Sequence, residues 1–299
     1  MRVGILGGGQ WGQALARLVI AAGNQPFIAY KERRPPHVLP STNKQTEVSE
    51  ACELLFVTTS AAEVRNAIRL AKPGPHNRVV VAGRGLDPVQ GGWLTDAITA
   101  ESDAIRVGAL AGPAAVAEIL NGGLCAGVIA SPYDEVRALT VRALHSTRYR
   151  CYESTDLDGV QLSGAMMPVL ASVLGLATSL GGAGVGLHGM VLARGLAEAV
   201  RLGQVIGADP VTFMGLAGVA DLVASQARPG NTYFDAGRAL AKGQRGEAPV
   251  ALARAVASLA AQHGVDVPLT RALIAVEEGL PPLEAVMALM QRDATHEGG

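Results

Sequence analysis

Apolar runs alternate with helix-like segments along the first half of the chain. The runs that predict strands are Val3 to Leu6, Phe27 to Tyr30, Leu54 to Thr58, Val79 to Ala82, Ile105 to Leu110 and Ala126 to Ala130. The helix-like segments are Gln10 to Ala22, Ala61 to Ala71, Leu94 to Ala100 and Tyr133 to His145. Because this alternation is typical of parallel strands joined by crossover helices, it predicts a doubly wound α/β sheet.

The pattern changes near residue 150. Tyr149 to Tyr152 would form a last edge strand, and after it the chain becomes a succession of segments rich in Ala, Leu and Gly. The predicted helices are Gly159 to Leu180, His188 to Ile206, Pro210 to Gly215, Phe234 to Ala241, Pro249 to His263, Leu269 to Glu277 and Pro282 to Gln291. We therefore expect an α/β domain over residues 1–150 and an all-α domain over residues 151–299.

Composition narrows the class of protein. Of the 299 residues, 49% are hydrophobic and 17% are charged, which is typical of a globular chain. The net charge of -1 argues against a nucleic-acid partner, since binding to the nucleic-acid backbone favours a clear excess of basic residues. The stretch between Asp158 and Arg194 has no charged residue and is long enough to span a bilayer. Pro168 and several glycines favour a buried helix instead, so no membrane span is expected.

The cysteines and the N-terminus indicate a cytoplasmic protein. Cys52, Cys125 and Cys151 are odd in number and lack metal-binding spacing, so we expect buried thiols in a reducing compartment and no metal site. The first residues, MRVGILGGGQ, lack the apolar core of a signal peptide. A helical second half so rich in small and apolar residues would bury a face between two copies, which predicts a homodimer.

A glycine motif follows the first predicted strand. Gly7, Gly9 and Gly12 have the G-x-G-x-x-G spacing, enclose Gln10 and Trp11, and precede a helix. In this context the glycines permit a tight turn, close approach of a pyrophosphate and packing of the helix on the strand. The free amides at the start of the helix would bind the phosphates. We expect a Rossmann-type dinucleotide-binding fold, the alternative being a merely structural turn.

The end of the second predicted strand bears on the choice of cofactor. It reads Tyr30-Lys31-Glu32-Arg33-Arg34, with three cations beside one acid. Lys31 and Arg33 would suit a 2'-phosphate, which favours NADP, while Glu32 keeps NAD open. A solvated basic loop is the alternative.

Over nearly its whole length the chain resembles the NAD(P)-dependent glycerol-3-phosphate dehydrogenase family. The matching segments are the glycine turn, FVTTSAAEVRNAI, VVVAGRGL, ALAGPAAVAEI, DLDGVQLSGAMMPV, LARGLAEAVRLGQVIGADPVTFMGLAGVADL and RALAKG. The block from Leu192 to Leu222 is the most specific. The resemblance implies an oxidoreductase that interconverts glycerol 3-phosphate and dihydroxyacetone phosphate.

The chain departs from the family where the proton chemistry belongs. The family has a lysine in a GALKN-type motif that exchanges a proton with the substrate oxygen as hydride moves. The matching stretch here is Gly164-Ala165-Met166-Met167-Pro168, so Met167 and Pro168 replace the lysine and asparagine. A second family lysine corresponds to Arg84, which keeps a cation but is too basic to donate readily. Ala114 replaces the family's serine after Gly-Pro.

Other family positions are retained or displaced. Asp221 keeps its place in the G-x-x-D-L motif, where the resemblance implies a role near the catalytic amine, and Arg194 keeps the Arg-Gly step that starts a helix near the site. Both would otherwise be structural salt-bridge residues. The family's Arg-Asn pair for the substrate phosphate aligns with Thr232-Tyr233, so Arg228 and Asn231 are candidates for a displaced phosphate clamp.

His188 is the candidate substitute for the missing amine, because its ordinary pKa suits proton transfer at neutral pH. Its alternative is a packing residue at a helix start. Three hypotheses follow: a family oxidoreductase with weak or altered activity on a small molecule, a pseudoenzyme that binds cofactor or a protein partner, and a hydroxyacid dehydrogenase of similar build. Met167 counts against the hydroxyacid dehydrogenase hypothesis as much as against the first, because a lysine performs the proton transfer in those enzymes too.

Overall fold

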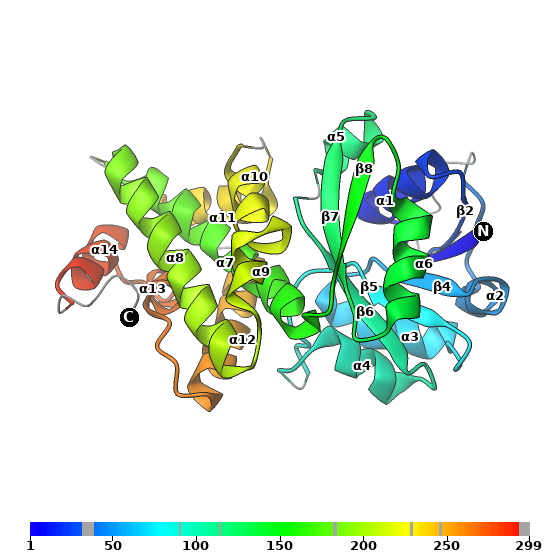
Figure 1. Cartoon of the computed structure of the whole chain (residues 1–299). Coiled ribbons are helices and arrows are strands. Elements are labelled where there is room, and N and C mark those ends of the chain that lie inside the picture. The colour runs from blue at the N-terminus through cyan, green and yellow to red at the C-terminus, as the bar shows by residue number, and fades with distance from the viewer. Residues whose placement is uncertain are drawn as a thin grey trace. The chain divides into compact units, whose positions relative to one another are not determined.

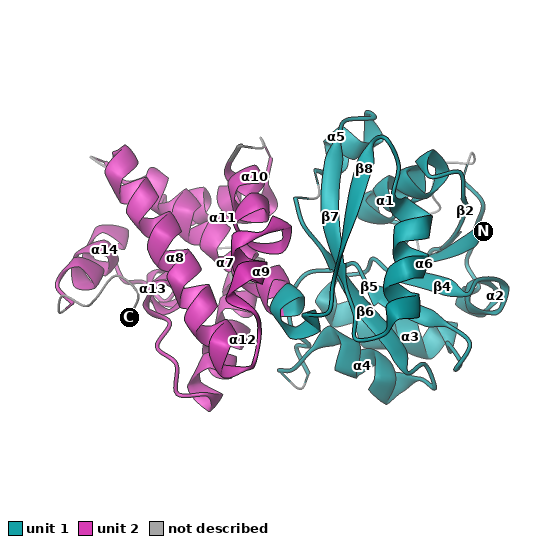
Figure 2. Cartoon of the chain, in the orientation of Figure 1, with its two compact units in different colours: residues 1–161 teal, residues 162–299 magenta. Residues whose placement is uncertain are grey.

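The computed structural model describes residues 1–31, 39–89, 91–113, 115–181, 184–227, 230–244 and 247–292. The chain divides into two compact units, Met1–Gln161 and Leu162–Gly299 (Figure 2). The predicted boundary at residue 150 falls inside the last strand, and the first unit continues to Gln161.

The first unit contains an eight-stranded sheet in the order β3-β2-β1-β4-β5-β6-β7-β8 (Figure 1). Its strands are β1 (Arg2–Leu6), β2 (Gln25–Ala29), β3 (Ser41–Thr42), β4 (Leu54–Val57), β5 (Arg78–Val81), β6 (Arg106–Ala111), β7 (Cys125–Ala130) and β8 (Tyr149–Ser154). Strands β1 to β6 run parallel, β7 is antiparallel to β6, and β8 is parallel to β7. The doubly wound prediction is thus confirmed.

Helices cover both faces of this sheet. They are α1 (Gln10–Ala21), α2 (Gln45–Ala51), η1 (Ala61–Glu63), α3 (Val64–Ala71), α4 (Leu94–Glu101), α5 (Val116–Leu120) and α6 (Asp134–Leu144). One core cluster joins Val3 and Ile5 of β1 to α1 and α6, and a second joins Leu6 to α2, α3 and α4. Because alternate residues of a strand point to opposite faces, the continuous apolar run of β1 fills both cores.

The second unit is helical in its described residues, as predicted. Its helices are α7 (Leu157–Thr178), which begins in the first unit, α8 (Val185–Val205), α9 (Pro210–Met214), the π-helix η2 (Leu216–Ala220), α10 (Asp221–Ala227), α11 (Thr232–Leu240), α12 (Glu247–Gln262), α13 (Pro268–Glu277) and α14 (Pro282–Met290). Asp209 caps α9 by accepting a hydrogen bond from Val211 N, with Pro210 in the first turn.

Helix α7 explains the long uncharged stretch. It is long and apolar enough to cross a membrane, yet its most apolar window is entirely buried in the structure. Met166, Leu170 and Leu174 have no more than 1% exposed surface. The apolar character of α7 is therefore accounted for by its place in the protein core.

A buried carboxylate joins α8 to α13. Glu198 accepts hydrogen bonds from Leu269 N at 2.9 Å, Thr270 N at 3.2 Å and Thr270 Oγ1 at 2.5 Å. Because α13 begins at Pro268, Glu198 satisfies amides of its first turn from a neighbouring helix. Burial raises the pKa of Glu198, and the bonds from Thr270 and Leu269 oppose that rise.

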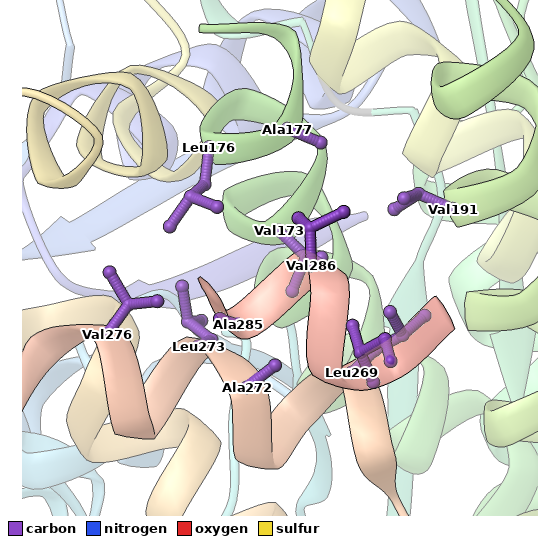
Figure 3. A pocket seen from close by; sticks show the side chains of 11 residues that line it. Val173, Leu176, Ala177, Val191, Leu269, Ala272, Leu273, Val276, Ala285 and Val286 are labelled. Atoms are coloured by element: carbon purple, nitrogen blue, oxygen red, sulfur yellow. The ribbon is translucent and has the colours of Figure 1, made fainter. Parts of the chain in front are cut away.

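An apolar pocket lies among α7, α8, α13 and α14 (Figure 3). It is lined by Val173, Leu176, Ala177, Val191, Leu269, Ala272, Leu273, Val276, Ala285, Val286 and Leu289. None of these side chains offers a hydrogen bond or a charge, so the pocket is unsuited to a phosphorylated substrate.

Candidate functional site

The glycine motif forms a tight turn between β1 and α1. Gly7 has a φ of +132°, which favours glycine, and a Cβ there would lie 2.5 Å from Thr58 Oγ1. A Cβ on Gly12 would overlap the carbonyl oxygen of Gly7, whereas the space beside Gly9 is open to 4 Å. The turn therefore has the close helix packing and the open approach that a pyrophosphate needs.

Backbone amides are available at this turn. Gly7 N donates to Ala29 O and Gln13 N to Gly9 O, but the amides of Gly8, Gly9, Gln10 and Trp11 donate to no residue within the described ranges. They lie at the positive end of the α1 dipole. These groups fit a dinucleotide's pyrophosphate, which they would hold through N–H donors.

Trp11 connects the turn to the end of β5. Its indole Nε1 donates to Ala82 O at 2.6 Å. The next residues form the loop that carries Arg84, whose Nη2 lies 3.5 Å from Gly112 O. Asp87 closes this loop by accepting from Arg65 Nη2 at 2.7 Å and from Val89 N at 3.1 Å. Trp11, predicted to bind the cofactor, and Arg84, predicted to replace a family lysine, thus belong to one region that these hydrogen bonds hold together.

The residues predicted to select the cofactor are only partly within the described ranges. Lys31 is exposed and forms an ion pair with Glu63 at 3.6 Å. Glu32, Arg33 and Arg34 lie outside the described residues. The preference for NADP remains a prediction.

Met167 and Pro168 lie in the interior of α7. The side chain of Met167 is fully buried. Pro168 has no N–H, so it gives no helical hydrogen bond to Gly164 O, four residues earlier. Ser172 Oγ lies 3.1 Å from Pro168 O and 3.0 Å from Tyr233 O, which links α7 to α11 beyond the proline. The residue predicted to replace the family lysine therefore lies in a buried, largely apolar part of the helix.

Asp221 follows an irregular segment. It is 2% exposed and begins α10 directly after the π-helix η2, where a Cβ on Gly218 would overlap Phe213 O. Such single π turns occur often at functional sites. Arg194 lies half-buried in the middle of α8, so the expectation that its Arg-Gly step starts a helix is wrong for this chain.

His188 lies in the first turn of α8 and contacts α10. Its Nε2 is hydrogen-bonded to Gln226 Oε1. This contact engages Nε2, so Nδ1 is the ring nitrogen without a hydrogen-bond partner among the described residues. The histidine is thus a helix-start residue, as in the alternative interpretation, and one of its two ring nitrogens is engaged by α10.

Asn231 caps a helix. Its Oδ1 accepts from Tyr233 N at 3.1 Å and from Phe234 N at 3.0 Å at the start of α11. Only its amide N–H groups are then left to donate to a substrate phosphate. Its proposed companion Arg228, like Ala114, lies outside the described residues.

The three cysteines form no disulfide within the described residues, and they differ in burial. Cys52 and Cys151 are buried, and Cys125 is only half-buried, so the expectation of three buried thiols is wrong for Cys125. Cys125 Sγ lies 2.9 Å from Pro113 O, at the loop that follows β6. No group of three or more metal-binding side chains occurs in the part of the chain that the structure describes.

Sequence reasoning missed the polar residues that support the glycine turn. Thr58 Oγ1 lies 3.0 Å from Gly7 O, and Gln13 Nε2 donates to Gly8 O at 2.9 Å. Thr58 was assigned only to a strand and Gln13 only to a helix. For Thr58 the signal is its position, because it directly follows β4, the neighbour of β1 at the point where the strand order reverses.

Comparisons with known proteins agree with this geometry. A family model described as NAD-dependent glycerol-3-phosphate dehydrogenase C-terminus matches residues 156–287. The glycerol-3-phosphate dehydrogenase (NAD(P)+) of Halorhodospira halophila is 33% identical over 97% of this chain and 96% of that protein. The corresponding protein of Ralstonia nicotianae is 34% identical over 99% of both. In fold, the crystal structure of glycerol-3-phosphate dehydrogenase from Coxiella burnetii is similar, with a TM-score of 0.88 at 23% identity over 97% of this chain and 99% of that one.

Relatives above 30% identity over nearly the full length establish the family, and the open glycine turn fits its cofactor. The chain belongs to the NAD(P)+-dependent glycerol-3-phosphate dehydrogenase family, and its cofactor is NAD or NADP.

Proposed function

We propose that this chain is an NAD(P)-dependent oxidoreductase of the glycerol 3-phosphate and dihydroxyacetone phosphate class with weak or altered activity. The observation that supports this proposal is a contrast between two sites. The glycine turn is open to a cofactor, whereas Met167, at the predicted position of the family lysine, is buried. In this proposal the first unit binds the cofactor, and the helical unit carries the substrate residues and a homodimer face. The protein acts in the cytoplasm.

The loss of the amine limits the chemistry. The bound cofactor accepts or supplies hydride, and the substrate oxygen must lose or gain a proton in the same reaction. A thioether carries no exchangeable proton, so Met167 cannot perform that transfer. Positioned proton transfer contributes roughly 10²- to 10⁴-fold to a rate, which is the size of the expected deficit.

Three groups are proposed to replace or assist the amine. His188 would exchange a proton through Nδ1, since Nε2 is engaged by Gln226. Asp221 would act as a charged partner in the same unit. Arg84 would stabilise negative charge on the substrate without donating its proton.

Substrate and cofactor selectivity follow from the remaining cations. Arg194, Arg228 and the amide of Asn231 are proposed to contact the substrate phosphate. Lys31 and Arg33 are proposed to favour the 2'-phosphate of NADP. Gly7, Gly9, Gln10, Trp11 and Gly12 form the pyrophosphate site in this proposal.

The second candidate function is a pseudoenzyme that binds the cofactor or a protein partner. It is favoured by the simultaneous replacement of three family polar positions by Met167, Pro168 and Ala114. Such a pocket is more apolar than one that binds a phosphorylated triol. Calorimetry of cofactor binding distinguishes two kinds of pseudoenzyme. Tight cofactor binding without turnover supports a cofactor sensor, and the absence of binding supports a structural scaffold.

The test combines turnover with restoration of the lysine. The wild type is assayed for NAD(P)H oxidation with dihydroxyacetone phosphate and with a panel of phosphorylated and carboxylated ketones. Met167→Lys with Pro168→Asn is then assayed, and Met167→Gln with Pro168→Asn serves as the matched control without a titratable amine. We expect slow wild-type turnover and a gain of at least about tenfold only with lysine.

Turnover by the wild type on a carboxylated ketone alone would favour the hydroxyacid dehydrogenase alternative. Cofactor binding by a folded wild type without turnover on any compound would contradict the oxidoreductase proposal and favour the pseudoenzyme.

A further inference from the structure

Three successive glycines leave the backbone of the proposed phosphate-binding turn with little steric restriction on its conformation. Gly7, Gly8 and Gly9 follow one another, and none has a side chain to restrict its peptide planes. A peptide flip in such a run would exchange an N–H for a C=O at the surface that faces the phosphates. The turn therefore needs restraint from outside its own backbone.

Every carbonyl of the run has a donor from elsewhere in the first unit. Thr58 Oγ1 lies 3.0 Å from Gly7 O and 3.1 Å from Leu6 O, so its single proton is shared between two carbonyls at the end of β1. Gln13 Nε2 donates to Gly8 O at 2.9 Å, and Gln13 N donates to Gly9 O at 3.0 Å.

These bonds also fix the direction of the amides. In a planar trans peptide the C=O of one residue and the N–H of the next point in opposite directions. Holding Gly7 O with Thr58 therefore sets the direction of Gly8 N–H, and holding Gly8 O with Gln13 sets that of Gly9 N–H. Both amides are among those with no acceptor within the described ranges.

We propose that Thr58 and Gln13 are positioning residues for the dinucleotide. Their side chains hold the carbonyls of the glycine run away from the cofactor, so that the amides meet the pyrophosphate and no carbonyl dipole opposes it. This inference rests on the proposed role of the glycine turn as the pyrophosphate site.

The experiment removes each side-chain hydrogen-bond donor while nearly keeping the shape of the side chain. Thr58→Val and Gln13→Met are made singly and together, with Thr58→Ser as the variant that retains the hydroxyl. Thr99→Val is the matched control, because Thr99 Oγ1 donates to the Asp96 carbonyl at 3.1 Å at an exposed position of α4, outside the turn. Dissociation constants for NADH and NADPH are measured by calorimetry, with thermal unfolding of each variant alongside.

We expect each single variant to bind both cofactors about 3- to 10-fold more weakly, from the loss of one hydrogen bond. Thr58→Ser and Thr99→Val are expected to keep wild-type affinity. Amide resonances of Gly8 and Gly9, which NADH should shift in the wild type, should shift less in Thr58→Val at saturating NADH. A purely structural threonine would change the unfolding temperature without changing that response.

Wild-type affinity in both folded single variants would overturn the inference, and so would Thr58→Ser binding as weakly as Thr58→Val. If Thr58→Val does not fold, Gln13→Met decides the matter. A folded wild type that binds neither NADH nor NADPH would instead overturn the proposed function of the turn and this inference with it.

Discussion

At the scale of single residues, Glu198 is a buried charged group that joins two helices of the second unit. Its carboxylate accepts three hydrogen bonds from Leu269 and Thr270, and it has no exposed surface. Glu198→Ala would leave these buried donors without an acceptor. We expect it to lower the free energy of unfolding by about 3 kcal/mol in urea titrations. Glu284→Ala, at an exposed position of α14, is the control and should change it by less than about 0.5 kcal/mol.

Glu101 gives a residue-scale prediction about pH. Hydrogen bonds from Arg69 and then Arg65 lower the pKa of its carboxyl from its ordinary value of 4.5 to about 2. A lowered folded pKa stabilises the protein above the ordinary value, and this stability is lost as the pH falls toward the folded value. We therefore expect the unfolding temperature to decrease between about pH 5 and pH 2 by less in Glu101→Gln than in the wild type. Equal slopes for both proteins would contradict this assignment.

At the scale of elements, α7 and α11 cross at two glycines. A Cβ on Gly175 would overlap Phe234 O, and one on Gly237 would overlap Ser172 O. We expect Gly175→Ala to destabilise the protein by about 1–3 kcal/mol, because the helix backbones would have to separate. Gly189→Ala in α8 is the matched control, since nothing lies within 4 Å of that position. It should stabilise by up to about 1 kcal/mol through helix propensity, and similar losses in both variants would argue against close packing.

Most helices and strands were predictable because their apolar periodicity is strong. The long helix α7 and the strand β1 are clear examples, since burial of their apolar residues determines both conformation and position. The sequence did not predict β3, α2, α5, η2 or α10. Each of these is short, and η2 and α10 fall in a Gly- and Ala-rich stretch without an amphipathic signal. The antiparallel direction of β7 also escaped prediction, because an apolar run carries no information on direction.

The candidate site was predictable only where a local motif marks it. The spacing of Gly7, Gly9 and Gly12 is visible in the sequence, and so is the replacement at Met167 once the resemblance is drawn. Thr58 is not, because it meets Gly7 only when β4 pairs with β1. Long-range pairing of this kind leaves no periodic trace in a single sequence.

At the scale of the whole molecule, the two compact units predict separable unfolding. A ligand stabilises only the structure that binds it, and a 100-fold excess over its dissociation constant adds about 2.7 kcal/mol. If the first unit alone holds the pyrophosphate, NADH should raise the temperature of one of two calorimetric transitions and leave the other unchanged. A control titration with nicotinamide, which has no phosphate, should move neither. A single transition that shifts as a whole would show that the units unfold together.

The unequal burial of the three thiols should allow one cysteine to be labelled selectively with a fluorophore. Burial raises the pKa of Cys52 to about 11 and that of Cys151 to about 12, so neither forms a reactive thiolate near neutral pH. A maleimide fluorophore added to the folded protein should therefore attach at Cys125, beside Pro113. The natural chain would then carry a single dye next to the loop after β6, and movements of that loop would become visible in the emission without any engineered cysteine.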